Sequence, residues 1–331
     1  MKKKESAKNK DNEYDFIILG AGVTGMAAAM YAARLEMKTL CFGASFGTEL
    51  PVGGVITTTN IVENYPGFIR LTGTELSEAI RKHAESYDLV RIKEEKVEKV
   101  ERKDKIFLVK TNKGEYKGKT ILFATGTKWR KLPESVKGSR EFENLGVAYC
   151  ALCDSVLFKN KIVALVGGSD SAAKDALVLA EHAKKVYIIY RGEKIHPEPI
   201  NMKRIEEKAK QGKIEIINKT NVIEIKGDKS VKLAVLDKPY KDKNELEVQG
   251  IFIAIGHIPL SDLAKSLGVK LNDKDEIIID HKTSETNIHG VYAAGDVADK
   301  PFKQAITGVA EGCTAAYSAF EYITKTKVVT S

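Results

Sequence analysis

The chain has 331 residues, of which 43% are hydrophobic and 30% are charged. These fractions exclude a disordered or membrane chain and are typical of a globular protein, and the length predicts about two domains. Its net charge of +8 is concentrated at the start, where the first ten residues carry five lysines and one acid. Later charged runs mix lysine with glutamate, as solvated faces do, so we expect no nucleic-acid partner.

The lysine-rich start is followed by an apolar stretch at residues 16–33 that has the outline of a signal peptide. Asp15 and Arg34 bound this stretch, and three spaced glycines interrupt it. No other apolar run reaches the length of a membrane span. We therefore expect a cytoplasmic protein that does not bind membranes. The cysteines are too few for a secreted, disulfide-rich protein of this length: Cys41, Cys150, Cys153 and Cys313.

The first predicted unit is a strand, a glycine turn and a helix. An apolar strand at residues 16–19 leads into Gly20, Gly22 and Gly25, and a helix is expected over residues 26–35. In a dinucleotide-binding turn, the first glycine permits the turn, the second lets the backbone approach a pyrophosphate, and the third lets the helix pack on the strand. The pattern predicts a dinucleotide site, with a flexible glycine loop as the alternative.

The acid that usually follows the second strand of such a unit is missing. That strand is expected at residues 38–42, and Gly43, Ala44 and Ser45 follow it. Because a carboxylate at this point ordinarily binds the ribose, Glu49 is the expected substitute.

A second unit of the same kind begins at Lys161. An apolar strand at residues 162–166 leads into Gly167, a helix runs to about residue 184, and another strand is expected at residues 186–190. Ser169 stands where the second glycine is expected, so its side chain would crowd a pyrophosphate. The pattern predicts either a dinucleotide site or a purely structural turn.

Near the C-terminus, an apolar strand at residues 290–294 ends in Gly295 and Asp296, and a helix is expected from about residue 304 to 322. A carboxylate at a strand end can accept a hydrogen bond from a sugar hydroxyl. This segment makes sense if it returns to complete the first unit. We therefore predict an α/β protein with two Rossmann-like, three-layer dinucleotide-binding domains, the second inserted in the first: residues 1–126 plus 257–331, and residues 127–256.

Cys150 and Cys153 form a C-x-x-C pair that is followed at once by Asp154. Such a pair is either half of a zinc site or a redox dithiol. A four-ligand zinc site needs partners, and Cys41, Cys313 and the six histidines form no second pair of this kind. The sequence therefore favours redox chemistry and no bound metal, and Cys41 and Cys313 are expected to pack in the core.

Together the motifs resemble the low-molecular-weight thioredoxin reductases, an FAD-dependent family of pyridine nucleotide-disulfide oxidoreductases, over about residues 14–323. The resemblance implies FAD in the first domain, NADPH or NADH in the inserted one, a homodimer, and an inserted domain that swings between flavin and partner. The segments that carry it occur in the family's order: residues 57–59, 62–67, 124–126, 150–154, 256–259, 295–297 and 303–305.

By the same resemblance, Cys153 is the thiol beside the flavin, Cys150 attacks the partner's disulfide, and Asp154 manages the proton. These roles suit thiol-disulfide exchange, in which a thiolate is the reactive species. Asp296 and Gln304 would hold the ribityl and isoalloxazine parts of FAD. The implied FAD residues are Gly20, Gly22, Gly25, Asn64, Val97, Ala124, Thr125, Gly126, Gly295, Asp296, Lys303, Gln304 and Ala305. The implied nicotinamide-nucleotide residues are Gly167, Ser169, Asp170, Ser171 and Arg191.

The departures from the family fall mainly in the inserted domain. Lys174 replaces a usual glutamate, and Gly192 stands where the family commonly has the second of two arginines that bind a 2′-phosphate. The resemblance therefore leaves the choice between NADPH, NADH and another donor open. The loop at residues 44–52 is also longer than the family norm.

The sequence thus predicts an enzyme that passes electrons from a reduced donor through FAD to Cys150 and Cys153, and then to the disulfide of a thioredoxin or glutaredoxin-like protein. Two alternatives remain within enzymes: a flavin dithiol oxidase, and a reductase fed by a deazaflavin or ferredoxin. A flavin-binding scaffold without turnover, or a zinc-binding module, is the alternative of a different class.

Overall fold

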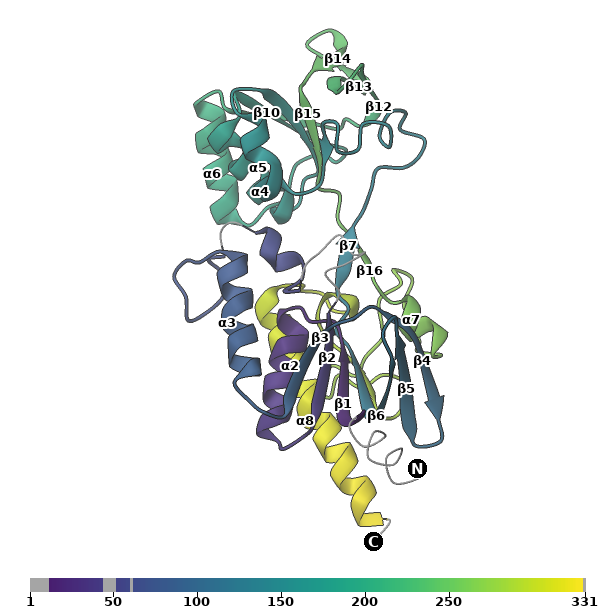
Figure 1. Cartoon of the computed structure of the whole chain (residues 1–331). Coiled ribbons are helices and arrows are strands. Elements are labelled where there is room, and N and C mark those ends of the chain that lie inside the picture. Colours follow the sequence, from purple (N-terminus) through teal and green to yellow (C-terminus); the bar gives the residue numbers. More distant parts are fainter. Residues whose placement is uncertain (1–11, 44–51, 60–61, 330–331) are drawn as a thin grey trace. The chain divides into compact units, whose positions relative to one another are not determined.

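The computed structural model describes residues 12–43, 52–59 and 62–329. The lysine-rich start and Glu49, the expected ribose ligand, lie outside the described residues. The chain divides into two compact units (Figure 1). The first unit comprises Met1–Lys128 and Ile258–Ser331, and the second comprises Trp129–His257.

The first unit contains a seven-stranded sheet in the order β3-β2-β1-β6-β5-β4, with β17 paired to β6. Strands β3, β2, β1, β6 and β17 run parallel, whereas β4 and β5 extend the sheet as an antiparallel pair. The bounds are β1 Glu13–Leu19, β2 Thr39–Gly43, β3 Val90–Glu94, β4 Val97–Lys103, β5 Ile106–Thr111, β6 Glu115–Phe123 and β17 Val291–Ala293.

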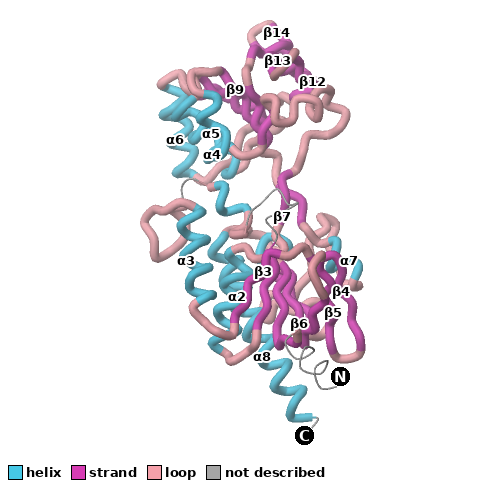
Figure 2. Tube along the Cα trace, viewed as in Figure 1, coloured by secondary structure: helices cyan, strands magenta, loops and turns pink. Residues whose placement is uncertain are grey.

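Residues 16–19 of β1 form a continuous apolar run because the sheet is covered on both faces. Phe16 and Ile18 pack in the core beneath the helices, while Ile17 and Leu19 pack in the core of the opposite face. The helices α2, α3 and α8 are Val23–Arg34, Gly73–Glu85 and Ala305–Val329, and α2 packs against both of the others (Figure 2). The short α7 is Asp262–Ser266, and its Ala264 belongs to the core of the other face.

Glycines on α8 allow its close approach to α2. A Cβ added at Gly308 would lie 2.5 Å from Thr24 Oγ1, and one at Gly312 would lie 2.5 Å from the Thr24 carbonyl oxygen. The four-residue spacing places both glycines on the same face of the helix. Only glycine therefore permits this packing, which fixes α8 beside the first glycine turn.

The second unit contains a five-stranded parallel sheet in the order β11-β10-β9-β15-β8. Val163 and Leu165 pack against α5, while Ala164 packs in the core on the opposite face with Ala234 of β13. The predicted α/β class with parallel sheets and helix layers is confirmed. The bounds are β8 Val147–Ala148, β9 Ile162–Val166, β10 Lys185–Tyr190, β11 Ile214–Asn218, β15 Gly250–Ile253, α4 Ala151–Asp154, α5 Asp170–His182 and α6 Pro199–Lys210.

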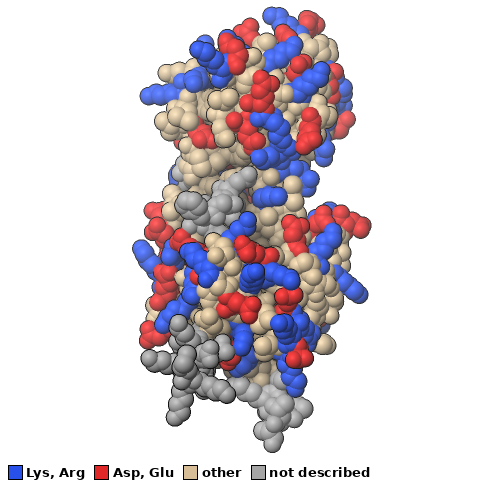
Figure 3. Space-filling model, turned by 45° about the vertical axis from the view of Figure 1, so that its right-hand side comes forward, with Lys and Arg blue, Asp and Glu red and all other residues tan. Residues whose placement is uncertain are grey.

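The sequence did not predict the second unit's three-stranded antiparallel sheet, β12 Val222–Gly227, β13 Val231–Tyr240 and β14 Lys243–Glu247. The two crossings between the units are β7, Thr127–Trp129, and β16, His257–Pro259, which pair with each other. Within the described ranges, no helix is long and apolar enough to cross a membrane. Figure 3 shows positive and negative side chains interspersed on the face in view, with no continuous basic stripe.

Candidate redox and cofactor sites

The first glycine turn follows β1 in a geometry that only glycine allows. Gly20 has a φ of +120°, and a Cβ there would lie 2.2 Å from the carbonyl oxygen of Ala124. A Cβ at Gly25 would lie 1.9 Å from the carbonyl oxygen of Gly20. The glycines at both positions therefore hold strand, turn and helix in close packing.

Gly22 differs from these two glycines because a Cβ there would clash with nothing in the described residues. A Cβ there would meet its nearest neighbour, the Gly53 carbonyl oxygen, at 3.8 Å. Gly22 is the N-cap of α2, with no side-chain cap and no acidic residue in the first turn. The helix N-terminus thus presents backbone N–H groups without a side-chain acceptor, which fits the pyrophosphate of a dinucleotide.

The ends of three parallel strands meet beside this turn. The Ala124 N–H donates to the Leu19 carbonyl (2.9 Å), and the Ala294 N–H donates to the Phe123 carbonyl (3.0 Å). Gly295 follows, with a φ of +80°, and a Cβ there would lie 2.8 Å from Thr24 Oγ1. The structure therefore brings the predicted segments at residues 20–25, 124–126 and 295–296 to one edge of the sheet. Thr125 is fixed there by a hydrogen bond from its Oγ1 to the Leu260 carbonyl (2.7 Å).

The acidic and amide candidates of this site differ in their present contacts. The Asp296 carboxylate makes no hydrogen bond or ion pair with the part of the chain that the structure describes, so it can accept a ligand hydroxyl. Asn64 Nδ2 donates to Gln304 Oε1 (3.0 Å), although 240 residues separate them. Ala305 begins α8 directly after Gln304, and Val97 begins β4.

Lys303 holds the backbone of the Asp296 turn. Its Nζ donates to the carbonyl oxygens of Asp296 (2.5 Å) and Ala298 (3.0 Å) and pairs with Glu276 Oε1 at 2.7 Å. The Lys303 ammonium group therefore stabilises the backbone conformation of this turn. Its contribution to a cofactor site is therefore indirect.

Two residues that the sequence reasoning missed support the same turn. Glu311 Oε2 accepts hydrogen bonds from the Gly295 N–H (2.9 Å) and from Lys300 Nζ (2.9 Å). The Lys300 side chain is only 4% exposed, so the pair is shielded from water. No motif marks it, because the contact depends on how α8 packs.

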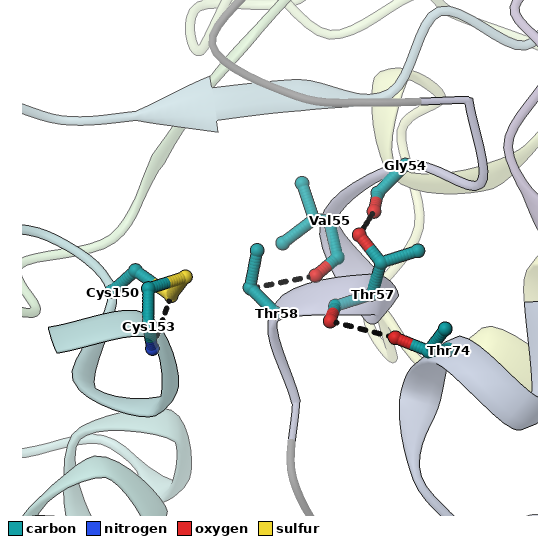
Figure 4. Close-up of a disulfide and its surroundings, with 7 residues drawn as sticks. All are labelled: Gly54, Val55, Thr57, Thr58, Thr74, Cys150 and Cys153. Carbon is teal, nitrogen blue, oxygen red and sulfur yellow. Dashed lines mark hydrogen bonds between the residues drawn. A yellow bond between two sulfur atoms is a disulfide. The ribbon is translucent and has the colours of Figure 1, made fainter. Parts of the chain in front are cut away.

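Residues 57–59 lie in and after η1, Val55–Thr58, and form a hydrogen-bonded turn in the first unit (Figure 4). Thr57 Oγ1 donates to the Gly54 carbonyl (2.8 Å), and Thr58 Oγ1 donates to the Val55 carbonyl (2.7 Å). Thr74 Oγ1 of α3 donates to the Thr57 carbonyl (3.3 Å). These threonines thus fix the backbone that follows Gly53 and Gly54.

Cys150 and Cys153 form a disulfide in the second unit, with their Cα atoms 5.3 Å apart (Figure 4). Cys150 is the N-cap of α4, and its Sγ accepts a hydrogen bond from the Cys153 N–H (3.1 Å). A hydrogen bond to sulfur favours the thiolate when the pair is reduced. Cys150 is 8% exposed, whereas Cys153 is exposed.

Asp154 ends α4 and is half-buried. Burial raises the pKa of its carboxyl above the ordinary value. A carboxyl that keeps its proton closer to neutral pH is better suited to exchange one with a neighbouring thiol.

An aromatic pair precedes the disulfide. The ring of Tyr149 stacks on Trp129 of β7, with centroids 6.5 Å apart. Burial, together with the charge of Glu143, raises the pKa of Tyr149 to about 12. Because Trp129 is the chain's one tryptophan, its fluorescence reports on the surroundings of Cys150.

The second glycine turn is capped by its own side chains. Ser169 is the N-cap of α5, and its Oγ accepts a hydrogen bond from the Ala172 N–H (3.4 Å). Asp170 Oδ1 accepts hydrogen bonds from the Glu198 N–H and from Asn201 Nδ2, both at 2.8 Å. Asp170 Oδ2 also pairs with Lys174 Nζ at 2.8 Å.

The other candidates around this turn have varied surroundings. Ser171 and Arg191 are exposed, while Gly167 is buried. Gly167 has a φ of +153°, and a Cβ there would lie 2.3 Å from the Ala254 carbonyl oxygen. It therefore has the same packing role as Gly20.

The two remaining cysteines lie in the first unit. Cys41 is fully buried in β2, and burial raises its pKa to about 12. Cys313 of α8 is half-buried, and burial raises its pKa as well. Among the described residues, no group of three or more His, Cys, Asp or Glu side chains could hold a metal ion.

The sequence profile of the family described as "Pyridine nucleotide-disulphide oxidoreductase" matches residues 14–312, and the chain belongs to this family. Its relatives identify the group within it, as predicted. Thioredoxin reductase from Peptoclostridium acidaminophilum is 37% identical over 95% of this chain and 98% of that protein.

Two solved structures agree with this placement. Thioredoxin reductase from Lactococcus lactis has a TM-score of 0.86 and 35% identity, over 94% of this chain and 99% of that one. The enzyme of the same name from T. acidophilum has a TM-score of 0.85 and 33% identity, over 94% and 98%. These likenesses confirm the predicted pair of Rossmann-like domains.

Proposed function

We propose that this protein is an FAD-dependent disulfide reductase that passes electrons to Cys150 and Cys153 and from them to the disulfide of thioredoxin. The observation that carries the proposal is the Cys150–Cys153 disulfide at the start of α4, followed directly by Asp154. The names of the relatives support thioredoxin as the partner, with a glutaredoxin-like protein as a close variant.

In this proposal the first domain, residues 1–126 plus 257–331, binds FAD. The unobstructed Gly22 and the N-terminus of α2, which has no side-chain cap, fit the pyrophosphate, and the Asp296 carboxylate fits a ribityl or ribose hydroxyl. Asn64 and Gln304 would contact the flavin end of the cofactor. When bound, FAD supplies the two-electron chemistry that reduces the disulfide.

The second domain, residues 127–256, carries the dithiol. In its reduced form, Cys150 as thiolate attacks one sulfur of the partner's disulfide, which forms a mixed disulfide and releases the partner's other thiolate. Cys153 then attacks Cys150, which restores the Cys150–Cys153 disulfide and releases the reduced partner. The two released thiolates take up two protons, and Asp154 is placed to deliver one of them.

The surface beside the dithiol suits a protein partner. Val156 and Leu157, which follow Asp154 by two and three residues, are 62% and 68% exposed. Neighbouring exposed apolar side chains are typical of an interaction surface. This favours a protein disulfide over a small disulfide as the substrate. We further propose a homodimer located in the cytoplasm, in line with the sequence resemblance.

Trapping of the mixed disulfide tests the proposal. The Cys153→Ser variant, once reduced, keeps Cys150 as the attacking thiol and should form a covalent complex with oxidised thioredoxin. Non-reducing electrophoresis and mass spectrometry would detect that complex. The Cys150→Ser variant is the matched comparison and should trap much less, while Cys313→Ser should turn over normally. The proposal would be contradicted if neither cysteine variant trapped thioredoxin. It would also be contradicted if the protein oxidised reduced thioredoxin with uptake of oxygen and did not reduce oxidised thioredoxin.

A further inference from the structure

The two glycine turns are equivalent residue by residue, which allows their ligand positions to be compared. Leu19 of β1 pairs with Phe42 of β2, and Val166 of β9 pairs with Ile189 of β10. The Gly20 N–H donates to the Phe42 carbonyl (2.9 Å), just as the Gly167 N–H donates to the Ile189 carbonyl (3.0 Å). The next residue of each second strand is therefore Gly43 in the first unit and Tyr190 in the second.

In a Rossmann fold, the residue that binds the adenosine ribose stands at the end of the second strand, about 20 residues after the glycines. Gly43 and Tyr190 therefore stand at the ribose position of their turns. In the first unit, Gly43 contributes no side chain of its own, and Ala21 Cβ and Val52 Cγ2 lie 2.8 and 2.9 Å from where its Cβ would be. In the second unit, the Tyr190 ring fills this position. A Cβ added at Gly168 would lie 2.4 Å from Tyr190 Cδ2, and one at Gly192 would lie 2.5 Å from its Cε1.

The ring is therefore held between the backbones of Gly168 and Gly192, and His196 holds it further. The Tyr190 hydroxyl lies 3.3 Å from His196 Nδ1, and the two ring centroids are 5.6 Å apart. The His196 N–H donates to the Gly168 carbonyl (2.8 Å), so the segment after β10 is tied back onto the glycine turn.

The start of α5 also differs from the start of α2 in its acidic side chain. Burial alone would raise the pKa of Asp170, but hydrogen bonds from Asn201, Lys174 and the Glu198 backbone hold it below the ordinary value. Asp170 is thus ionised at neutral pH, with its charge balanced by Lys174 Nζ at 2.8 Å, and its carboxylate is tied up by contacts within the protein. The first turn of α2 contains no acid.

We propose that Tyr190 is a specificity-determining residue that occupies the ribose position of the second turn and excludes NADPH and NADH from it. The inference rests on the proposed function, since it concerns how that enzyme selects its electron donor. Electrons must then reach the flavin from a donor that does not bind at residues 167–191.

Direct binding tests this inference without turnover. Calorimetric titration of the oxidised, flavin-loaded protein with NADPH and with NADH should give dissociation constants weaker than about 1 mM, as expected for a filled site. Tyr190→Gly, which copies Gly43, should bind both nucleotides at least about tenfold more tightly. Tyr190→Phe keeps the ring, so this variant should bind both nucleotides as weakly as the parent protein. Tyr187→Phe, on the same strand but packed against Tyr240, is the matched control and should equal the parent.

Micromolar binding of either nucleotide by the unaltered protein would overturn the inference, whatever the variants do. No gain in a folded Tyr190→Gly protein would overturn it too, and Tyr190→Ser serves if the glycine variant does not fold. The proposed function is tested separately by reducing each protein with dithionite and adding oxidised thioredoxin. If the chemically reduced protein does not reduce thioredoxin and still does not bind nucleotides, the proposed reductase function is wrong, but the inferred role of Tyr190 is not affected.

Discussion

The two glycine turns share one backbone plan and differ in what surrounds it. The turn after β1 has glycine at Gly22, no side-chain cap on its helix and no side chain at Gly43. The turn after β9 has Ser169 as a side-chain cap, an ionised Asp170 and the ring of Tyr190. A repeated fold therefore does not imply a repeated ligand, since binding depends on the side chains at the turn.

The largest effect is expected at the Cys150–Cys153 dithiol. This dithiol gives the second unit a function even if the second glycine turn binds no nucleotide. Cys150→Ser and Cys153→Ser should each abolish thioredoxin reduction while FAD stays bound, because the cofactor contacts lie in the other unit. Spectra should distinguish the two variants. Cys150→Ser keeps the thiol assigned to the flavin and should show a long-wavelength charge-transfer band, whereas Cys153→Ser should lack it. Turnover by either variant would disprove the dithiol assignment.

Asp154→Asn should lower the rate of thioredoxin reduction by about 100-fold, the scale of a lost proton donor. Its effect on stability should have the opposite sign. Burial raises the pKa of the native carboxyl, so ionising it disfavours the folded state as the pH rises through that pKa. The variant should thus melt no lower than the parent at pH 7, and any gain should vanish below the ordinary carboxyl pKa of about 4. A lower melting temperature at pH 7 with unchanged activity would make Asp154 a structural residue.

Alanine at matched positions should separate the two turns. Gly22→Ala places its Cβ at an ordinary contact distance of 3.8 Å from the Gly53 carbonyl oxygen, so the fold should persist while FAD affinity falls by about tenfold or more. Gly168→Ala would push its Cβ into the Tyr190 ring, so stability should fall by about 1–3 kcal/mol while FAD stays bound. Flavin content and thermal unfolding measure both quantities. Loss of FAD from Gly168→Ala but not from Gly22→Ala would reverse the contrast.

Preference for NADPH should be harder to install than the sequence alone suggests. Replacing Ser169 by glycine and Gly192 by arginine removes the crowding and restores an arginine. However, the Cβ at position 192 would lie 2.5 Å from Tyr190 Cε1. The double change should therefore fail alone. Added to Tyr190→Gly, it should favour NADPH over NADH by about 10- to 100-fold, the value of one charged hydrogen bond. Equal gains in both backgrounds would show that Tyr190 does not obstruct the site.

The smallest expected effect is spectroscopic. Reducing the Cys150–Cys153 disulfide should alter the emission of Trp129, because its ring stacks on Tyr149 beside Cys150. Cys150→Ser should show no such change on adding a reductant. An emission that is indifferent to the disulfide in the parent protein would show that the stacking does not respond to redox state.

The sequence predicted the α/β class, the strands around both turns and the family, because apolar strands and glycine spacing are local signals. It could not predict how distant residues meet. The Lys300–Glu311 pair at Gly295 depends on the packing of α8. Likewise, the sequence placed Tyr190 at the end of a strand, directly before Arg191 and Gly192, but did not show what its ring contacts. Its position over Gly168 depends on the fold of residues 192–196, which carries no sequence signal.

Anaerobic reoxidation of the flavin shows whether electrons pass from FAD through Cys150 to thioredoxin. The protein is first reduced chemically, so that no nicotinamide nucleotide is needed, and oxidised thioredoxin is then added while the flavin absorbance and free thiols are followed. We expect the flavin to reoxidise as thioredoxin gains its two thiols, and Cys150→Ser to leave both the flavin and thioredoxin unchanged. A flavin that stays reduced in the parent protein, or one that reoxidises equally in Cys150→Ser, would contradict electron transfer through this dithiol.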